Sequence, residues 1–392
     1  MRNTPVYMDY HATTPVDKRV LEAMMPFFTE HFGNAASLQH RFGWIAKEAV
    51  DIARKKIAAS LRVQAGEIFF TSGATESNNL AIKGIAEAYK TKGNHIITTQ
   101  IEHKCVLESC KKLEKAGWIV TYLPVDVKGK VNIAALEKSI TGKTVLVSVM
   151  AANNEIGTIQ PIEEIGAVCA KHGILFHTDA TQAVGRIPID PLAMNIHLLS
   201  FASHKIYGPK GVGALYIRSK NPRVAVETQM HGAGHEHGLR SGTLNVAGVV
   251  GFAKAMQLAM EESEDENARL FRLRNRLQEQ LMSMEGVSVN GASEDRLPNN
   301  LNVTFLGISS DQIMTEMNDV AVSAGSACTS EETGEIRYSH VLRAIGLDES
   351  AGRSTIRFGL GRFTTEDEVD YTADRIRTVV TSLKEQTGIG IS

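Results

Sequence analysis

Seven short apolar runs alternate with amphipathic stretches between about residues 67 and 217, and this alternation limits the folds open to the chain. The runs are EIFFTSG, HIITTQ, WIVTYLPV, TVLVSVMA, GILFHTDA, LLSFASHK and VGALYI, and the stretches between them include helix-period segments at 77–89 and 162–171. Continuous apolar strands separated by helices are typical of a mostly parallel sheet that is covered on both faces. The sequence therefore predicts an α/β unit with a seven-stranded sheet flanked by helices.

A second, smaller α+β domain is predicted after about residue 262. The segment EDENARLFRLRNRLQEQLMSM has the pattern of a long charged helix with Leu270, Leu273, Leu277 and Leu281 on one side. Strand-like LNVTF and STIRFGL follow, and Thr365 with Glu368 has the spacing of a capping box that opens a last helix. We expect the large domain to span 15–262, and the small domain to comprise 1–14 and 263–392.

Composition excludes several classes of protein. With 43% apolar residues, 22% charged residues and a formal net charge of −2, the chain resembles an ordinary soluble protein with no surface for nucleic acid or membrane. The start has no signal-peptide pattern, and no apolar run is long enough to span a membrane. The cysteines are too few for a disulfide framework, which predicts free thiols in a reducing cytoplasm: Cys105, Cys110, Cys169 and Cys328.

Polar residues follow five of the apolar runs, at the point where each predicted strand ends. In open parallel sheets, ligands bind outside the carboxyl ends of the strands, so these residues are expected to meet at one edge. Any one of them could be an ordinary loop residue, whereas their joint occurrence predicts a site. They are Thr71 and Ser72, then Glu102 and His103, Asn153 and Asn154, His177 to Asp179 with Gln182, and Ser203 to Lys205.

Three of these elements together indicate pyridoxal phosphate. Gly73 and Thr75 lie at a turn into a helix whose amide N–H groups suit a phosphate, while the nucleotide P-loop pattern is absent. A lysine at the end of an apolar strand, Lys205, can lose its proton by desolvation and form a Schiff base. Asp179, at the end of the neighbouring strand, can hold a ring nitrogen protonated. Taken alone, Lys205 could equally be a surface lysine, as Lys210 is expected to be.

The chain resembles the cysteine desulfurases of the class-V aminotransferases, on the fold-type I pyridoxal-phosphate scaffold, and is most similar to the Isc/Nif branch. The resemblance covers nearly the whole chain, and the ordered Asp-Ala-x-Gln, Ser-His-Lys and Gly-Ser-Ala-Cys elements make it specific. It is carried by YMDYHATTPVD, FGNAASLQHRFG, TSGATESNNLAIKG, IEHKCVLESC, NNEIGTIQPI, HTDATQAVG, SHKIYGPKGVGALY, HGAGHEHGLRSGTLN, SAGSACTS and IRFGLGRFTTEDE.

The resemblance implies roles for the residues around the cofactor ring. Lys205 matches the Schiff-base lysine that also moves protons at the substrate carbon. Asp179 matches the partner of the pyridine nitrogen, and His103 matches the imidazole that stacks on the ring and acts in acid–base chemistry. Gln182 and Asn154 match residues near the phenolic oxygen and the substrate.

The resemblance also implies a phosphate cradle formed by Ala74, Thr75 and His204. Thr243 would add a contact from the other subunit of a homodimer. Many relatives carry a serine three residues before the lysine, where this chain has Ala202, and Ser203 follows one position later. Either Ser203 compensates, or the cradle has one donor fewer.

For the substrate, L-cysteine, the resemblance implies a carboxylate clamp at Arg357 and a nucleophile at Cys328. Cys328 would attack the substrate sulfur, leaving alanine and an enzyme persulfide, and would carry the sulfur to an acceptor such as an iron–sulfur scaffold or a thiolation enzyme. The glycines and polar residues around Cys328 suit a segment that moves. No metal site is expected beyond transient ligation of a transferred cluster by Cys328.

Other interpretations stay open at this stage. A selenocysteine lyase or an aminotransferase would share the scaffold, although an aminotransferase needs no cysteine in GSACTS; a catalytically idle scaffold protein would not need Lys205, Asp179 or Arg357. We expect Cys105, Cys110 and Cys169 to pack in the core. The histidines of HGAGHEHG are expected to form an entrance loop to the active site rather than a metal site.

Overall fold

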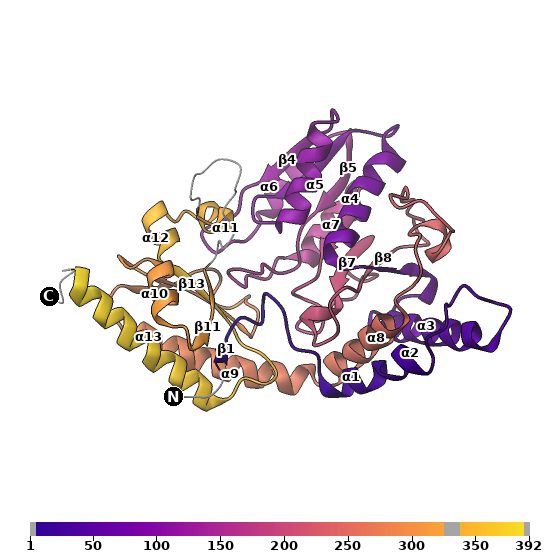
Figure 1. Cartoon of the computed structure of the whole chain (residues 1–392). Coiled ribbons are helices and arrows are strands. Elements are labelled where there is room, and N and C mark those ends of the chain that lie inside the picture. The colour runs from indigo at the N-terminus through magenta and orange to yellow at the C-terminus, as the bar shows by residue number, and fades with distance from the viewer. Residues whose placement is uncertain (1–4, 325–337, 388–392) are drawn as a thin grey trace.

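The computed structural model describes residues 5–324 and 338–387. Figure 1 shows a large sheet-containing unit and a smaller unit, with α8 and α9 running in succession between them. The predicted fold class is confirmed, because the chain folds as a mostly parallel α/β sheet with flanking helices and an additional small antiparallel sheet.

All seven predicted strands form one sheet, in the spatial order β2-β8-β7-β6-β5-β3-β4. Strand β8 is antiparallel to both β2 and β7, and the other pairs are parallel, so β2 to β7 all run in the same direction. Their carboxyl ends therefore lie at one edge. The strands are β2 (Ile68–Thr71), β3 (His95–Thr99), β4 (Ile119–Leu123), β5 (Thr144–Ser148), β6 (Leu175–Asp179), β7 (Leu198–Ala202) and β8 (Gly213–Ile217).

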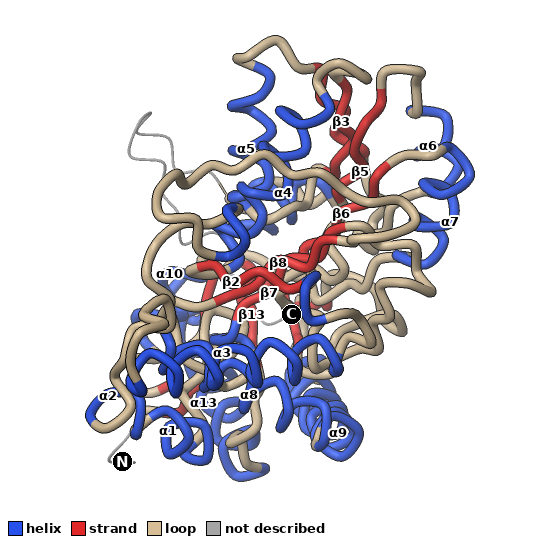
Figure 2. The backbone as a smooth tube through the Cα atoms, turned by 90° about the vertical axis from the view of Figure 1, so that its right-hand side faces the viewer, coloured by secondary structure: helices blue, strands red, loops and turns tan. Residues whose placement is uncertain are grey.

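Helices cover both faces of this sheet, which explains why its strands are apolar throughout. Alternate strand residues point to opposite faces: Leu146 packs in the core under α4 and α5, and Val147 packs in the core under α3, α7 and α8. Figure 2 shows α4 and α5 on one side of the strands and α6 and α7 on the other. The helices of this unit are α1 (Lys18–Met24), α2 (Pro26–Thr29), α3 (Arg41–Ser60), α4 (Ala74–Tyr89), α5 (Lys104–Glu114), α6 (Ile133–Ser139), α7 (Ile162–His172) and α8 (Val246–Glu261), with short 3-10 turns η1 (Ala65–Glu67), η2 (Ser203–Lys205) and η3 (Glu236–Gly238).

The smaller unit is a four-stranded antiparallel sheet under two long helices. The four leucines predicted on one side of α9 are all buried, and they pack against β10, β13 and α13. The predicted capping box is present, because Thr365 and Glu368 each accept the other's backbone N–H. The elements are α9 (Ser263–Met282), β9 (Val287–Val289), β10 (Asn300–Phe305), α10 (Ser310–Glu316), β11 (Val320–Ala321), β12 (Ser323–Ala324), α11 (His340–Ala344), α12 (Glu349–Arg353), β13 (Thr355–Gly359) and α13 (Glu366–Thr387).

Two segments join the units across the sheet edge. The N-terminal strand β1 (Val6–Tyr7) pairs with β11, and the chain then crosses to the large unit, where Thr14 N–H donates to the His204 carbonyl over 3.1 Å. Helix α11 packs Val341 and Leu342 against Ile101 and Ile156 of the large unit. The division at residues 14/15 and 262/263 remains our proposal.

Within the described residues, no helix combines the length and the apolar composition needed to cross a membrane.

Candidate active site

The predicted lysine lies at the sheet edge in a largely desolvated position. Lys205 follows β7 in η2, and its Nζ donates to the carbonyl oxygens of His11 and Ala12 over 2.5 and 2.7 Å. Burial, reinforced by the positive charge of Arg357, lowers the pKa of Lys205 to about 8, while Asp179 and Asp9 oppose the shift. Roughly a tenth of this amine is therefore neutral at pH 7, far more than for an ordinary lysine, and the neutral form is the nucleophile. Lys210, by contrast, is exposed as predicted.

Asp179 ends β6 and is held by two donors. Its Oδ2 accepts from Asn78 Nδ2 over 2.7 Å, and its Oδ1 accepts from the Thr181 backbone N–H over 3.0 Å. The residue is only 5% exposed, and these donors replace the water that its side chain loses on burial. Asn78 lies one turn into α4 and was not singled out in the sequence. The sequence signal that could have pointed to Asn78 is its position on the helix that begins at the predicted phosphate site.

His103 caps the N-terminus of α5. Its Nδ1 accepts from the Cys105 backbone N–H over 3.2 Å, which holds the ring at the end of the helix. Burial lowers the pKa of His103, and Lys205 and Lys104 lower it further against the opposing charge of Asp179. The imidazole is therefore neutral at physiological pH, and a neutral ring can stack on a cofactor without placing a second cation beside Lys205.

The N-terminus of α4 has the backbone geometry of an anion site. Gly73 has φ = 151°, which favours glycine, and a Cβ built on it would meet nothing within 4 Å. Open space therefore lies beside the helix start, where Ala74 and Thr75 provide the first N–H groups.

The other predicted cradle residues lie nearby with different partners. His204 Nδ1 is 3.1 Å from Thr13 Oγ1, and burial, with Lys205 and Lys210, lowers the pKa of His204 to about 4, so the ring is neutral. Ser203 is fully buried, and its Oγ has no hydrogen-bond partner in the described part of the chain. Thr243 is exposed.

Gln182 does not stand alone but fixes a histidine that the sequence did not reveal. Gln182 Oε1 lies 3.0 Å from His11 Nδ1, and Gln182 Nε2 donates to the His11 carbonyl over 3.1 Å. His11 is buried with its Nε2 unpartnered, and burial, with Arg357, lowers its pKa to about 3. Because His11 lies 194 residues before Lys205, only the fold brings the two together.

Arg357 extends from β13 of the small unit to the same edge. Its Nη1 donates to the Asn154 carbonyl over 3.0 Å, and its Nη2 pairs with Asp9 Oδ1 at 2.7 Å, while its Nε is buried without a partner. Asn154 and Arg357, both predicted to bind substrate, are thus in direct contact. Asp9 is a partner that sequence reasoning missed.

Cys328 lies outside the described residues, but the segments on either side of it border the site. Before it, Ser323 of β12 pairs in register with Arg357. After it, Ser339 Oγ donates to Glu155 Oε2 over 2.5 Å, next to Asn154. Burial raises the pKa of Glu155 to about 7.

The three described cysteines pack in or against the apolar cores, as predicted. Cys110 and Cys169 are buried in the apolar cores. Cys105 packs against the same core as Cys110 but is only partly buried, and its sulfur also contacts His103 and Asn78, which the sequence did not predict.

The segment HGAGHEHG, residues 231–238, is held in place by the buried carboxylate of Glu236. Glu236 forms a bidentate ion pair with Arg54 and accepts from the Phe70 N–H. Among the described residues, no group of three metal-ligating side chains occurs.

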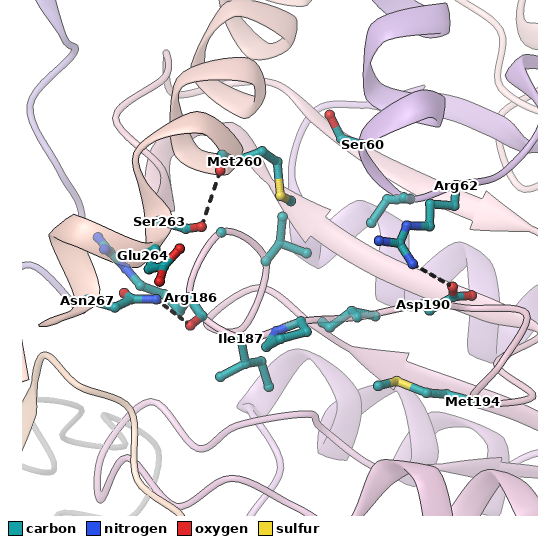
Figure 3. Close-up of a pocket in the computed structure, with 15 residues that line it drawn as sticks. Ser60, Arg62, Arg186, Ile187, Asp190, Met194, Met260, Ser263, Glu264 and Asn267 are labelled. Atoms are coloured by element: carbon teal, nitrogen blue, oxygen red, sulfur yellow. Dashed lines mark hydrogen bonds and ion pairs between the residues drawn. The ribbon is translucent and has the colours of Figure 1, made fainter.

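A separate cavity of about 420 Å³ lies between the end of α3 and the start of α9 (Figure 3). Ile187, Met194 and Met260 contribute to its lining, and the predicted site residues are not among its lining residues.

The residues at the sheet edge fit pyridoxal phosphate. They combine an amine with a lowered pKa, a carboxylate held by two donors, a neutral imidazole and an open helix start. Several buried polar atoms at this edge have no partner among the described residues, which is expected of a site that holds a polar ligand: His11 Nε2, Asn78 Oδ1 and Thr178 Oγ1.

Comparison with known proteins decides the family. The family model for aminotransferase class-V matches residues 6–372. A protein named cysteine desulfurase IscS from Glaesserella parasuis serovar 5 is 52% identical over 385 residues, which cover 97% of this chain and 94% of the relative. The chain belongs to the class-V aminotransferase family and is a cysteine desulfurase of the Isc/Nif type.

Solved structures agree with this placement of the desulfurase. A structure named NifS-like protein superposes with a TM-score of 0.90 at 41% identity, and the match covers 96% of this chain and 100% of that structure's chain. A structure titled SspA in complex with cysteine superposes with a TM-score of 0.80 at 39% identity over 92% of this chain and 100% of its own. The fold-type I scaffold and the pyridoxal-phosphate cofactor predicted from the sequence are thereby confirmed.

Proposed function

We propose that this desulfurase converts L-cysteine to L-alanine and passes the sulfur, through a persulfide on Cys328, to an acceptor protein for iron–sulfur cluster assembly or thiolation. The observation that carries the proposal is the placement of Lys205. Its amine has a pKa of about 8 and feels the charges of both the carboxylate Asp179 and the guanidinium Arg357. One basic group thus lies between a cofactor partner and a substrate clamp.

The chain would hold pyridoxal phosphate through residues already in position. Lys205 would bind it through its amine, Asp179 would face the ring nitrogen, and His103 would stack on the ring. The start of α4 at Ala74 and Thr75, with Ser203 and His204, would bind the phosphate. When bound, the cofactor supplies an electron sink for the substrate carbon.

Arg357 would bind the substrate carboxylate with its planar pair of donors. Its Nη2 already binds Asp9 and its Nη1 the Asn154 carbonyl, so the guanidinium is fixed before substrate arrives. The unpartnered Nε–H of Arg357 could donate a further hydrogen bond to the substrate carboxylate. Such a fixed clamp reduces the conformational entropy lost on binding.

Lys205 would take up and return protons at the substrate carbon, because its pKa near 8 permits both directions close to neutral pH. His103 and Gln182 border the same space and would orient the reacting groups. Cys328 would form a bond from its sulfur to the substrate sulfur, and the Cβ–S bond would break. The protein would then hold the persulfide and release alanine after protonation of that carbon.

A homodimer is proposed from an exposed apolar face. Phe28 of α2, Phe32 of the following loop and Trp44 of α3 are 55%, 63% and 56% exposed, and large apolar side chains exposed together mark interaction sites. The ring of Phe42, also exposed, lies 5.4 Å from that of Phe32, so these two side chains adjoin. Exposed Thr243 would then contribute to the partner's phosphate site. A Phe32→Glu variant should give a monomer in light scattering, and an unchanged mass would contradict this interface.

We also place the desulfurase in the cytoplasm. The three described cysteines are free, which suits a reducing compartment.

The test of the proposed function is a product analysis. Purified protein loaded with pyridoxal phosphate should turn yellow and, with L-cysteine and a reductant, yield alanine and sulfide in equal amounts. An aminotransferase would instead yield a keto acid, and that result would overturn the proposal. Transfer of radiolabelled sulfur to candidate acceptors, compared between the wild type and Cys328→Ala, would identify the partner.

A further inference from the structure

A second thiol lies inside the site, and the proposed sulfur transfer does not use it. Cys105 occupies the first turn of α5, and its Sγ is 3.0 Å from His103 Nδ1 and 3.2 Å from Asn78 Nδ2. Both distances fall within hydrogen-bonding range for sulfur. Cys105 therefore connects the imidazole of His103 to α4, the helix that carries Asn78.

The Asn78 amide links the thiol to Asp179. Its Nδ2 is 2.7 Å from Asp179 Oδ2 and 3.2 Å from Cys105 Sγ, so each of its two N–H groups has an acceptor. A flipped amide would turn its oxygen toward the carboxylate, which is unfavourable, and this fixes the orientation. The chain Asp179–Asn78–Cys105–His103 is thus continuous and directional.

The directions of these bonds determine where the His103 proton lies. Nδ1 accepts the Cys105 backbone N–H, so in the neutral ring it carries no hydrogen and Nε2 is protonated. The Cys105 thiol has one hydrogen of its own. The Asn78 amide and the Thr75 side chain act on the sulfur as donors, which leaves His103 Nδ1 as the acceptor for that hydrogen. Thiol and backbone N–H thus converge on one nitrogen.

We propose that Cys105 is a positioning residue, whose thiol, aligned by Asn78, donates to Nδ1 of His103 and keeps that ring neutral with its proton on Nε2. A hydrogen bond to the neutral form disfavours the charged form. Four ionisable groups also act on the ring: Lys205 and Lys104 disfavour protonation, Asp179 favours it, and His340 of α11 lies within electrostatic range. The inference rests on the proposed function, because His103 matters to catalysis only if the cofactor binds here.

The environment of Cys105 argues against a second sulfur nucleophile. Burial and the charge of Asp179 raise its pKa to about 12, so the thiol keeps its hydrogen at physiological pH. The thiolate is the nucleophilic form of cysteine. Cys105 therefore has the protonation state of a donor and not that of a sulfur carrier.

The test compares Cys105→Ala, which removes the donor, with Cys105→Ser, which keeps a donor and an acceptor. Cys110→Ala, a buried residue on the same helix, is the matched control. The first readout is nitrogen-15 NMR of histidine-labelled, cofactor-free protein, with His103 assigned by loss of its signal in His103→Asn. In the wild type, Nε2 should be protonated and Nδ1 not. Removing the donor should raise the His103 pKa by about half a unit to one unit, the equivalent of one hydrogen bond, while Cys105→Ser and Cys110→Ala should titrate close to the wild type.

The second readout is the pH profile of kcat in the loaded enzyme. Because the neutral ring is the active form in this proposal, the acid limb of Cys105→Ala should move to higher pH by the same amount, with KM for cysteine little changed. The opposite tautomer in the wild type, an unshifted His103 pKa in Cys105→Ala, or a Cys105→Ser variant that behaves like Cys105→Ala would each overturn the inference. Failure of the wild type to form alanine would overturn the proposed function instead, and the cofactor-free titration would still decide the role of Cys105.

Discussion

Two buried polar clusters of this protein differ in how completely they are satisfied. At the junction of α8 and α9, Glu266 binds Arg186 at 2.5 Å and Arg362 at 2.8 Å, and Arg362 also binds Asp17 at 2.8 Å. At the sheet edge, the buried atoms His11 Nε2, Asn78 Oδ1 and Thr178 Oγ1 have no partner among the described residues. The charged groups of the junction are all paired among the described residues, and one buried amide oxygen there, Asn267 Oδ1, has no partner. The unpartnered atoms of the sheet edge include His11 Nε2 and Asn78 Oδ1, whose residues contact Lys205 and Asp179. The charges of the junction thus already have their partners, whereas the unpartnered atoms of the sheet edge are candidates for ligand contacts.

The largest effect on activity is expected when the amine at the sheet edge is removed. Lys205→Ala should abolish the yellow colour and reduce alanine formation by on the order of 10³-fold or more, since proton transfer alone contributes about 10²- to 10⁴-fold. Absorbance and product assays check this. Lys210→Ala, five residues on and exposed, should keep both colour and rate; similar losses in the two variants would contradict the assignment.

The junction should show the opposite pattern, with loss of stability rather than of chemistry. Glu266→Gln leaves Arg186 and Arg362 without their shared carboxylate, and breaking such a buried pair costs about 3–5 kcal/mol. Denaturant unfolding of the cofactor-free protein should show that decrease in the free energy of unfolding, while kcat per folded molecule falls far less than in Lys205→Ala. The exposed neighbour Glu264 provides the control Glu264→Gln, which should be close to neutral. An equally stable Glu266→Gln protein would remove the contrast.

A smaller effect is expected at the substrate clamp. Arg357→Lys keeps the charge but loses the planar pair of donors, so KM for cysteine should rise about 10- to 100-fold with a smaller change in kcat. Steady-state kinetics measure both. Arg353→Lys, on a partly exposed residue of α12, should leave KM unchanged. A normal KM in Arg357→Lys would mean that another residue binds the carboxylate.

The smallest effect concerns the pH dependence of cofactor loading. The neutral amine is the reactive form, and burial lowers the pKa of Lys205 to about 8. The rate at which cofactor-free protein binds pyridoxal phosphate should therefore rise with pH and level off above about 8, with roughly a tenfold change across the lower part of this range. Stopped-flow absorbance would follow it. A rate that keeps rising toward pH 10, the range of an ordinary lysine, would contradict the desolvated amine.

The repeating parts of the fold could be predicted from the sequence. The seven apolar runs form one sheet, and Leu270 to Leu281 line the buried side of α9. Both depend on periodicity, which is local. Strand order could not be predicted in this way, because it is set by pairing between distant segments.

Residue type and position at strand ends predicted that Lys205, Asp179 and His103 lie at one edge of the sheet, and the structure places them there. Asp9 and His11 were missed because their partners are distant in the chain. Arg357 lies 348 residues after Asp9, and Lys205 lies 194 residues after His11. Cys105 packs against the core as predicted, but its contact with Asn78 could not be predicted, because only the approach of α4 to α5 brings the two residues together. A periodic sequence pattern does not show which side chains of two neighbouring helices face each other.

The most direct measurement is a single turnover with one equivalent of L-cysteine and no reductant, followed by peptide mass spectrometry and quantification of alanine. The account predicts one extra sulfur atom on the peptide that contains Cys328, one alanine per active site, and an unmodified Cys105. Alanine formed without added sulfur on Cys328, or sulfur found on Cys105 instead, would contradict it.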